Sequence, residues 1–277
     1  MKTAFQQNTD IKMSTKTYSQ SKNDDNSLVQ QCFNSSATTY QQRAVLQKDL
    51  GTDLLKTLMP AVVNNREIIL DLGCGPGLFS QPLSELSEHL ISLDASLSML
   101  QANPNSQTKL TCDSHQLSLL DNCVDLVFSN LMIQWCDFET VVNEVYRVLK
   151  PGGESVISTL LPGSLYELQQ AWQVVDDDEH IHQYQSLHTI QDCLANMNWK
   201  TVETQTKRYT YYYESARALA RELKSLGANA VKGRSSKALC GKGKWLAMES
   251  AYVKNFADPA SNLLPATYRA LIIKLKK

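Results

Sequence analysis

Compact apolar runs alternate with amphipathic segments through the middle of the chain. Each run is rich in Val, Ile and Leu and is bounded by polar residues or glycine, which is typical of a buried strand. Because strands that alternate with helices pair through right-handed crossovers, the pattern predicts a parallel sheet covered on both faces. The predicted strands are residues 67–72, 89–94, 110–112, 124–129 and 155–160, and the helices between them are 79–87, 96–101 and 138–149.

The segments before and after this alternating core have a different pattern of apolar positions. Leucine recurs at every fourth position from Leu46 to Leu58, which predicts a helix that stops at Pro60. We therefore expect an α/β fold with a doubly wound, mostly parallel, seven-stranded sheet and a helical insertion at about 214–258, before the last strand. The later elements are helices at 164–175, 186–197, 214–226 and 245–256, and strands at 200–213 and 266–276.

Composition narrows the class of protein. Hydrophobic residues make up 43% and charged residues 20% of the 277 positions, which is ordinary for a globular protein. No run approaches the roughly 20 apolar residues of a membrane span. The formal net charge of −1 argues against general nucleic-acid binding, which usually needs a basic domain. Seven scattered cysteines without a CxxC pair favour reduced thiols in the cytoplasm over a disulfide framework or a zinc site.

The first 26 residues differ from the rest of the chain. They are polar, contain few large apolar side chains and lack the apolar segment of a secretory signal. We expect residues 1–26 to be a disordered tail and residues 27–277 to form a single domain.

A glycine-rich loop follows the first predicted strand of the sheet. It reads DLGCGPG from Asp71 to Gly77 and leads into a helix, so the backbone at Gly73 and Gly75 can turn sharply and approach a ligand. A structural turn alone explains a lone GxG. A dinucleotide site of the GxGxxG type places a third glycine where Leu78 stands here, and the carboxylate of Asp71 repels a pyrophosphate but suits an amino group and a sulfonium.

Two further acids follow the next two strands. Asp94 ends the second strand, where a carboxylate binds both ribose hydroxyls of a nucleotide-like cofactor. Asp113, followed by Ser114, comes after the third strand and can accept a hydrogen bond from an adenine amino group. Met99 either packs on the adenine ring or belongs to the core. Three acids at three strand ends with this loop resemble the class I methyltransferases, which implies S-adenosylmethionine as cofactor and leaves NAD(P) as the alternative.

The segment after the fourth strand borders the acceptor in this arrangement. It runs from residue 128 to 136 and includes Asn130, Gln134 and Trp135. Gln134 and Trp135 can form the wall of a small acceptor pocket. The alternative for Trp135 is that it caps the core. The Asn-Pro-Pro-aromatic signature of amino-directed nucleic-acid methylases is absent. The five histidines are dispersed, and His180 and His182 are expected in an exposed acidic turn without a metal. The lack of an evident base favours an acceptor that is already nucleophilic, such as a carboxylate.

The predicted insertion is basic on one side. Arg217, Arg221 and Lys224 lie about 200° around a helix from a leucine face. A solvated face accounts for this pattern, and so does a binding surface for an acid. Residues 231–244 continue with five basic residues and no acid, and they lack the aromatic side chains that stack on RNA bases.

Segments distributed over nearly all of the chain after the tail resemble one family, the malonyl-acyl-carrier-protein O-methyltransferases of biotin synthesis. The segments that carry the likeness are FNSSATTY at 33–40, DLGCGPG at 71–77, SNL at 129–131, QWC at 134–136, GSLYEL at 163–168 with AW at 171–172, and LKSLGAN at 223–229. The tail and the Lys242–Lys244 stretch depart from the family pattern.

The resemblance implies methyl transfer from S-adenosylmethionine to the free carboxylate of a malonyl thioester, with acyl carrier protein as an acidic partner. It implies that Tyr40 closes over the cofactor and that Ser114 and Asn130 join the cofactor site. It also implies that Arg221, with Lys224 and Arg234 as alternates, binds the malonyl group or its phosphopantetheine arm. Two other functions stay open: methylation of another small carboxylic acid or a quinone precursor, and non-catalytic binding of S-adenosylmethionine by a partner protein.

Overall fold

The chain folds around one seven-stranded sheet. The computed structural model describes residues 23–36, 40–58, 66–106, 108–227 and 241–277. The strand order is β3-β2-β1-β4-β5-β7-β6, and β7 runs antiparallel to both of its neighbours while the other pairs are parallel. This confirms the predicted doubly wound, mostly parallel sheet. The strands are β1 (Arg66–Leu72), β2 (Ser87–Asp94), β3 (Thr108–Thr111), β4 (Val124–Asn130), β5 (Leu149–Leu160), β6 (Thr201–Tyr213) and β7 (Leu264–Lys276).

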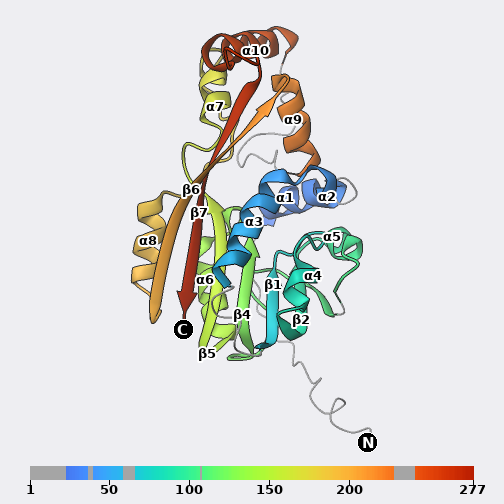
Figure 1. Cartoon of the computed structure of the whole chain (residues 1–277), viewed down its shortest axis with the longest axis vertical. Coiled ribbons are helices and arrows are strands. Elements are labelled where there is room, and N and C mark those ends of the chain that lie inside the picture. The colour runs from blue at the N-terminus through green and yellow to red at the C-terminus, as the bar shows by residue number, and fades with distance from the viewer. Residues whose placement is uncertain (1–22, 37–39, 59–65, 107, 228–240) are drawn as a thin grey trace, which may run out of the picture.

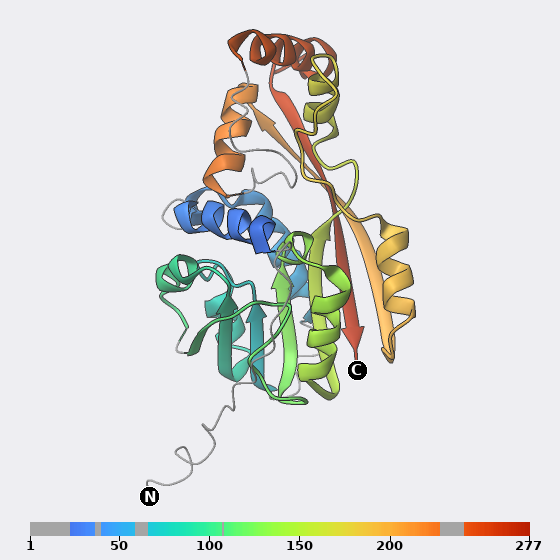
Figure 2. The same cartoon turned by 180° about the vertical axis from the view of Figure 1, so that it is seen from behind.

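Helices cover both faces of the sheet because successive residues of the buried strands point to opposite sides. In β4, Leu126 and Phe128 join the core beneath α3 (Val45–Leu58) and α4 (Ser80–Ser84). Val127, between them, joins the core beneath α6 (Phe138–Val148) and α8 (Leu187–Ala195). Figure 1 shows α3 in front of the sheet, and Figure 2 shows α6 on the other face.

The remaining helices lie beyond the carboxyl ends of the central strands (Figure 1). The long β6–β7 pair extends past the sheet and carries α7 and α10 at its far end and α9 beside it. Tyr209 and Tyr211 of β6 donate hydrogen bonds to Asp53 (2.7 Å) and Asp49 (2.6 Å) of α3. These helices are α1 (Asn23–Ser36), α2 (Tyr40–Arg43), α5 (Leu97–Ala102), α7 (Tyr166–Gln173), α9 (Ala216–Ser225) and α10 (Lys242–Phe256).

Several boundaries differ from the prediction, and two of these differences change the account of the fold. Helix α1 begins at Asn23, so residues 23–26, which were assigned to the disordered tail, are helical. Residues 1–22 lie outside the described part of the chain. Residues 150–153 lie between the predicted helix 138–149 and the predicted strand 155–160, but β5 already begins at Leu149. The backbone N–H of Gly152 donates to the carbonyl of Lys277, and the N–H of Lys277 donates to the carbonyl of Gly153, which holds this stretch beside the end of β7. Pairing with a distant strand therefore overrides the local Pro-Gly-Gly signal.

Candidate cofactor and acceptor site

A cavity of about 380 Å³ lies at the carboxyl ends of β1, β2, β3 and β4. Such a crevice outside the strand ends is where open α/β sheets bind ligands. Gln30 and Phe33 of α1 and Tyr40 of α2 line it from the helical layer that lies over the strands. The cavity also contains most of the residues that the sequence predicted for the cofactor: Tyr40, Gly73, Gly75, Asp94, Met99, Asp113, Ser114 and Asn130.

The three glycines of the loop differ in what surrounds them. All three have positive φ angles: 72° at Gly73, 53° at Gly75 and 81° at Gly77. A Cβ at Gly73 would lie 2.2 Å from Cγ of Met132, and one at Gly77 would lie 2.2 Å from Oδ1 of Asn103. A Cβ at Gly75 would meet no atom within 4 Å. Gly73 and Gly77 therefore allow close packing, whereas Gly75 leaves space in the cavity wall for a ligand.

Asp94 fastens the loop to the start of the next helix. Its carboxylate accepts a hydrogen bond from the backbone N–H of Gly75 (2.9 Å) through Oδ2 and from that of Ser96 (2.8 Å) through Oδ1. Burial raises the pKa of this carboxyl, and the two backbone hydrogen bonds oppose the rise. Asp94 therefore both shapes the loop and lines the cavity at the end of β2, and its role as a ribose ligand stays a prediction.

Asp113 is oriented by a histidine that the sequence analysis did not select. The backbone N–H of Asp137 donates to Nε2 of His115 (2.9 Å), so the ring proton lies on Nδ1, which donates to Oδ1 of Asp113 (2.6 Å). This hydrogen bond lowers the pKa of Asp113 against the opposing effect of partial burial. The signal for His115 was its position two residues after the acid, where its own backbone N–H also bonds the carboxylate (2.9 Å).

Three smaller side chains complete the predicted cofactor set. Asn130 is fixed by its Nδ2 donating to the carbonyl of Gln47 (2.8 Å) and by its Oδ1 accepting from Ser158 (2.8 Å). Ser114 lies against the thiol of Cys136 (3.3 Å). Met99 is 1% exposed and still lines the cavity, so its two proposed roles coincide. These contacts hold polar atoms in fixed positions around the cavity.

Tyr40 lines the cavity close to Asp94. Burial raises the pKa of its phenol, and the negative charge of Asp94 raises it further. The hydroxyl therefore stays protonated at neutral pH and remains available as a hydrogen-bond donor.

Asp71 does not line the cavity, in contrast to the prediction. It is 3% exposed and lies behind the loop, where the hydroxyl of Ser80 donates to its Oδ2 (3.5 Å). Burial and the charge of Asp94 raise its pKa to about 8. The backbone of Gly73 and Gly75, rather than this carboxylate, forms the cavity wall at this point.

The segment after β4 reaches the cavity as expected, but only one of its two selected residues lines it. Trp135, in the short 3₁₀ helix Ile133–Trp135, lines the cavity and meets the ring of Phe33 edge to face, with centroids 5.7 Å apart. The side chain of Gln134 is not part of the lining, and its backbone oxygen instead accepts from Nε2 of His182 (3.0 Å).

The basic residues of the insertion lie outside the cavity. Leu219 of α9 and Leu226, the residue that follows this helix, are buried, whereas Arg221 and Lys224 are exposed, which confirms the predicted two-faced helix. The end of α9 contacts the helical layer over the cavity, where Ser36 donates to the backbone oxygen of Lys224 (3.4 Å). Arg234 and most of the 231–244 run lie outside the described residues.

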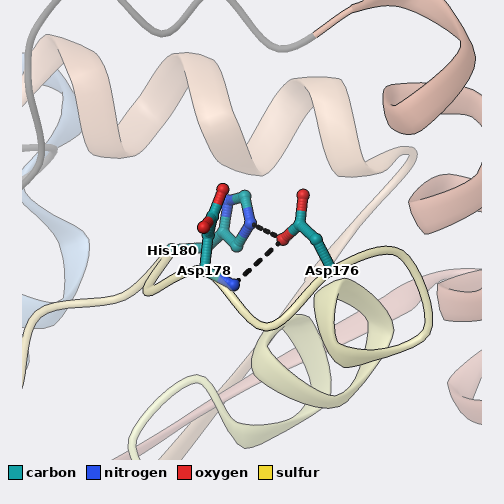
Figure 3. A group of neighbouring side chains, drawn as sticks. All are labelled: Asp176, Asp178 and His180. Carbon is teal, nitrogen blue, oxygen red and sulfur yellow. Dashed lines mark hydrogen bonds and ion pairs between the residues drawn. The ribbon is translucent and has the colours of Figure 1, made fainter.

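The expectation of an exposed turn around His180 was wrong. Its side chain is only 3% exposed and stacks on Trp172, with ring centroids 3.8 Å apart. Ligand atoms of Asp176, Asp178 and His180 lie within 4.8 Å of one another (Figure 3). However, Asp176 already accepts from His180 (2.6 Å) and forms an ion pair with Lys244 (2.8 Å). We therefore assign this cluster to holding the loop and propose no metal there.

Comparison with known proteins identifies the family. A family model described as "Methyltransferase domain" matches residues 70–157. A malonyl-acyl-carrier-protein O-methyltransferase of Alcanivorax borkumensis is 33% identical over 258 residues, which cover 90% of this chain and 86% of that protein. The chain belongs to the malonyl-acyl-carrier-protein O-methyltransferase family. A member from Serratia marcescens is 34% identical over 81% of this chain and 87% of its own length.

Other comparisons agree with this family and with the fold. The chain spans 50% of a bifunctional biotin biosynthesis protein of Cellvibrio japonicus, at 33% identity over 91% of this chain. The solved structure of the YcgJ protein from Bacillus subtilis matches 82% of this chain and 98% of its own at 15% identity, with a TM-score of 0.58. The solved structure of a putative methyltransferase from Bacillus halodurans matches 82% of this chain and 99% of its own at 16% identity, with a TM-score of 0.56.

The cavity fits S-adenosylmethionine, the methyl donor of this methyltransferase. Its volume lies within the range of about 300–1,000 Å³ that is usual for small-molecule and cofactor sites. The open space at Gly75 admits a ligand against the loop backbone. The carboxylates of Asp94 and Asp113 line the cavity and can accept hydrogen bonds of the kind that ribose hydroxyls and an adenine amino group donate. Within the described ranges, no helix has the length and hydropathy needed to cross a membrane.

Proposed function

We propose that this protein transfers a methyl group from S-adenosylmethionine to the free carboxylate of malonyl-acyl carrier protein, and that the resulting methyl ester primes pimeloyl synthesis for biotin. The observation that carries the proposal is the one-third identity to relatives of this name over four fifths or more of both chains. At 90% of this chain, the match to the Alcanivorax relative extends well beyond residues 70–157, which the more general methyltransferase family model matches.

In this proposal, different residues of the site bind the cofactor and shield the acceptor from water. Asp94 binds the ribose hydroxyls, Asp113 accepts from the adenine amino group, and the loop at Gly75 gives backbone access. Bound S-adenosylmethionine supplies an electrophilic methyl group on a sulfonium. A carboxylate is ionised at neutral pH, so the protein needs to align it and exclude water rather than remove a proton. Phe33 and Trp135, whose rings meet over the cavity, supply that exclusion.

The exposed basic face of α9 is the docking surface in this proposal. Arg221 and Lys224 are exposed and near the helical layer over the cofactor cavity, and Arg234 follows in the same basic stretch of sequence. An acidic carrier protein is attracted to such a face, which raises its association rate. We place the protein in the cytoplasm, because the six cysteines among the described residues form no disulfide with one another.

The test is a comparison of acceptors with labelled S-adenosylmethionine. We expect label on malonyl-acyl carrier protein in a base-labile form, and none on acetyl-acyl carrier protein, which has no free carboxylate. Faster labelling of free malonate or another small acid than of the carrier-bound group would favour the small-acid alternative. Cofactor binding without turnover of any thioester would favour the non-catalytic alternative.

A further inference from the structure

A second cavity lies beside the cofactor cavity. Its volume is about 430 Å³, and it is bounded by the loop after β5, by α7 and by residues 177–184. Its lining combines aromatic rings with side-chain amides, and the principal members are Gln169, Trp172, Gln173, His180, His182 and Tyr184.

One pair of rings separates the two cavities. Trp135 lines the cofactor cavity and His182 lines the second one. Their ring centroids are 4.7 Å apart. His182 is held in this position because its Nε2 donates to the backbone oxygen of Gln134 (3.0 Å), a carbonyl that can only accept. A group bound in the second cavity against His182 is therefore one ring pair away from the cofactor.

The far side of the second cavity is held rigidly. His180 lies flat on Trp172, with 2° between the ring planes. Asp176 holds the imidazole through a 2.6 Å hydrogen bond (Figure 3) and is itself paired with Lys244 at the start of α10. The hydrogen bonds from Lys244 and His180 lower the pKa of Asp176, so the carboxylate stays charged. The stacked rings thus form a fixed apolar wall rather than a mobile turn.

The chemistry of the lining indicates what kind of chain fits. The rim carries three exposed acids, Asp177, Asp178 and Glu179, and these repel a free dicarboxylate. Carboxylates and the side-chain amides of Gln169 and Gln173 do accept hydrogen bonds from amide N–H groups. Aromatic rings provide packing area for the apolar parts of a flexible chain. An extended chain that carries amides but no charge satisfies all of these groups.

We propose that the second cavity receives the amide-bearing pantetheine arm of the acceptor thioester and presents its acyl end at the Trp135–His182 pair. This assignment rests on the proposed function, because the acceptor is taken to be a malonyl thioester of acyl carrier protein. It gives roles to His182 and to the backbone of Gln134, which hold the ring pair past which the acyl end reaches the cofactor cavity. The exposed acids repel free malonate, which carries two carboxylates, more strongly than the malonyl thioester, which carries one, and α9 remains the surface that binds the carrier protein itself.

A matched pair of variants on α7 tests the assignment. Gln169 is exposed and lines the cavity, whereas its neighbour Gln170 is exposed and does not. We expect Gln169→Trp to raise the KM for malonyl-pantetheine by about tenfold or more while the Kd for S-adenosylhomocysteine stays unchanged. Gln170→Trp should leave both constants within about twofold of wild type. Equal KM values for the two variants would overturn the proposal.

Tryptophan fluorescence gives a readout that needs no turnover. Unmodified pantetheine should change the emission of the full-length protein, and Trp172→Phe should remove that change. Trp199, which packs on Tyr146 at 4.9 Å, supplies the control variant Trp199→Phe. Failure of pantetheine to change the emission, or its displacement by free malonate, would contradict the assignment. Because this readout does not depend on methyl transfer, it separates failure of the arm site from failure of the proposed function.

Discussion

The glycine loop allows a sharp test of which backbone positions face the cofactor. The substitution Gly75→Ala places a methyl group in the cavity wall, where no atom lies within 4 Å. A φ of 53° costs an L-residue about 1–2 kcal/mol, and the lower entropy of the unfolded alanine chain offsets about 0.4–1 kcal/mol of this. We therefore expect a net loss of about 1 kcal/mol in the free energy of unfolding, or a fall in Tm of about 2–3 °C.

The matched substitution Gly77→Ala also places an L-residue at a positive φ, but in a crowded position instead of an open one. Its new Cβ would lie 2.2 Å from Asn103, whose side chain is fully buried and donates to Ser80 (2.8 Å). Overpacking costs about 1–3 kcal/mol, and breaking a buried hydrogen bond costs a similar amount. Gly77→Ala should therefore lower the free energy of unfolding by about 3 kcal/mol or more.

The assay is calorimetric titration with S-adenosylmethionine, combined with thermal melts of both variants. Gly75→Ala should fold nearly as well as wild type and bind about tenfold or more weakly, because the methyl group occupies ligand space. Gly77→Ala should show its loss mainly in stability. An unchanged affinity in Gly75→Ala, or a less stable Gly75→Ala than Gly77→Ala, would refute the division of roles between these glycines.

Asp71 is protonated in the fold until about pH 8, far above its unfolded pKa, so its stabilising contribution is full at low pH and is lost as the pH rises through 8. The urea midpoint of the ligand-free protein should fall between about pH 4 and 8 and level off above pH 8, and Asp71→Asn should flatten that fall; an equally steep fall in the variant would contradict this. His115→Leu removes the hydrogen bond that orients Asp113 and should weaken S-adenosylmethionine binding by about tenfold in a titration, whereas no change would assign His115 to the fold alone. Arg221→Ala should raise the KM for malonyl-acyl carrier protein, but not for malonyl-pantetheine, and this difference should shrink at high salt; equal effects on both acceptors would place Arg221 away from the carrier protein.

Local patterns were sufficient to predict the seven strands, the helices from α3 to α10 and the strand-end acids, but not α1 and α2. Each buried strand is a short apolar run, and the parallel arrangement brings Asp94 and Asp113 to the same edge of the sheet. The depth of Asp71 was not predictable in this way. Its position at a strand end suggested exposure to the ligand, but the loop after it turns back so that the backbone of Gly73 and Gly75 lines the cavity instead.

Contacts between distant segments account for the other differences. Phe33 reaches the cavity because α1 packs over the start of α5, where the hydroxyl of Ser96 donates to Asn34 (2.5 Å). No local periodicity encodes a contact across 62 positions. His180 was expected in solvent because acids surround it in sequence, yet one of those acids holds it against Trp172. In both cases the partner residue, rather than the local composition, decides the burial.

The position of the transferred methyl group tests the central claim most directly. Malonyl-acyl carrier protein is incubated with S-adenosylmethionine that carries ¹³C in its methyl group, and the product is examined by NMR before and after mild base. We expect a single labelled O-methyl ester on the malonyl group, which mild base removes as methanol. A labelled methyl group on the malonyl carbon that resists base, or no label on the carrier-bound group, would contradict the proposed carboxyl methylation.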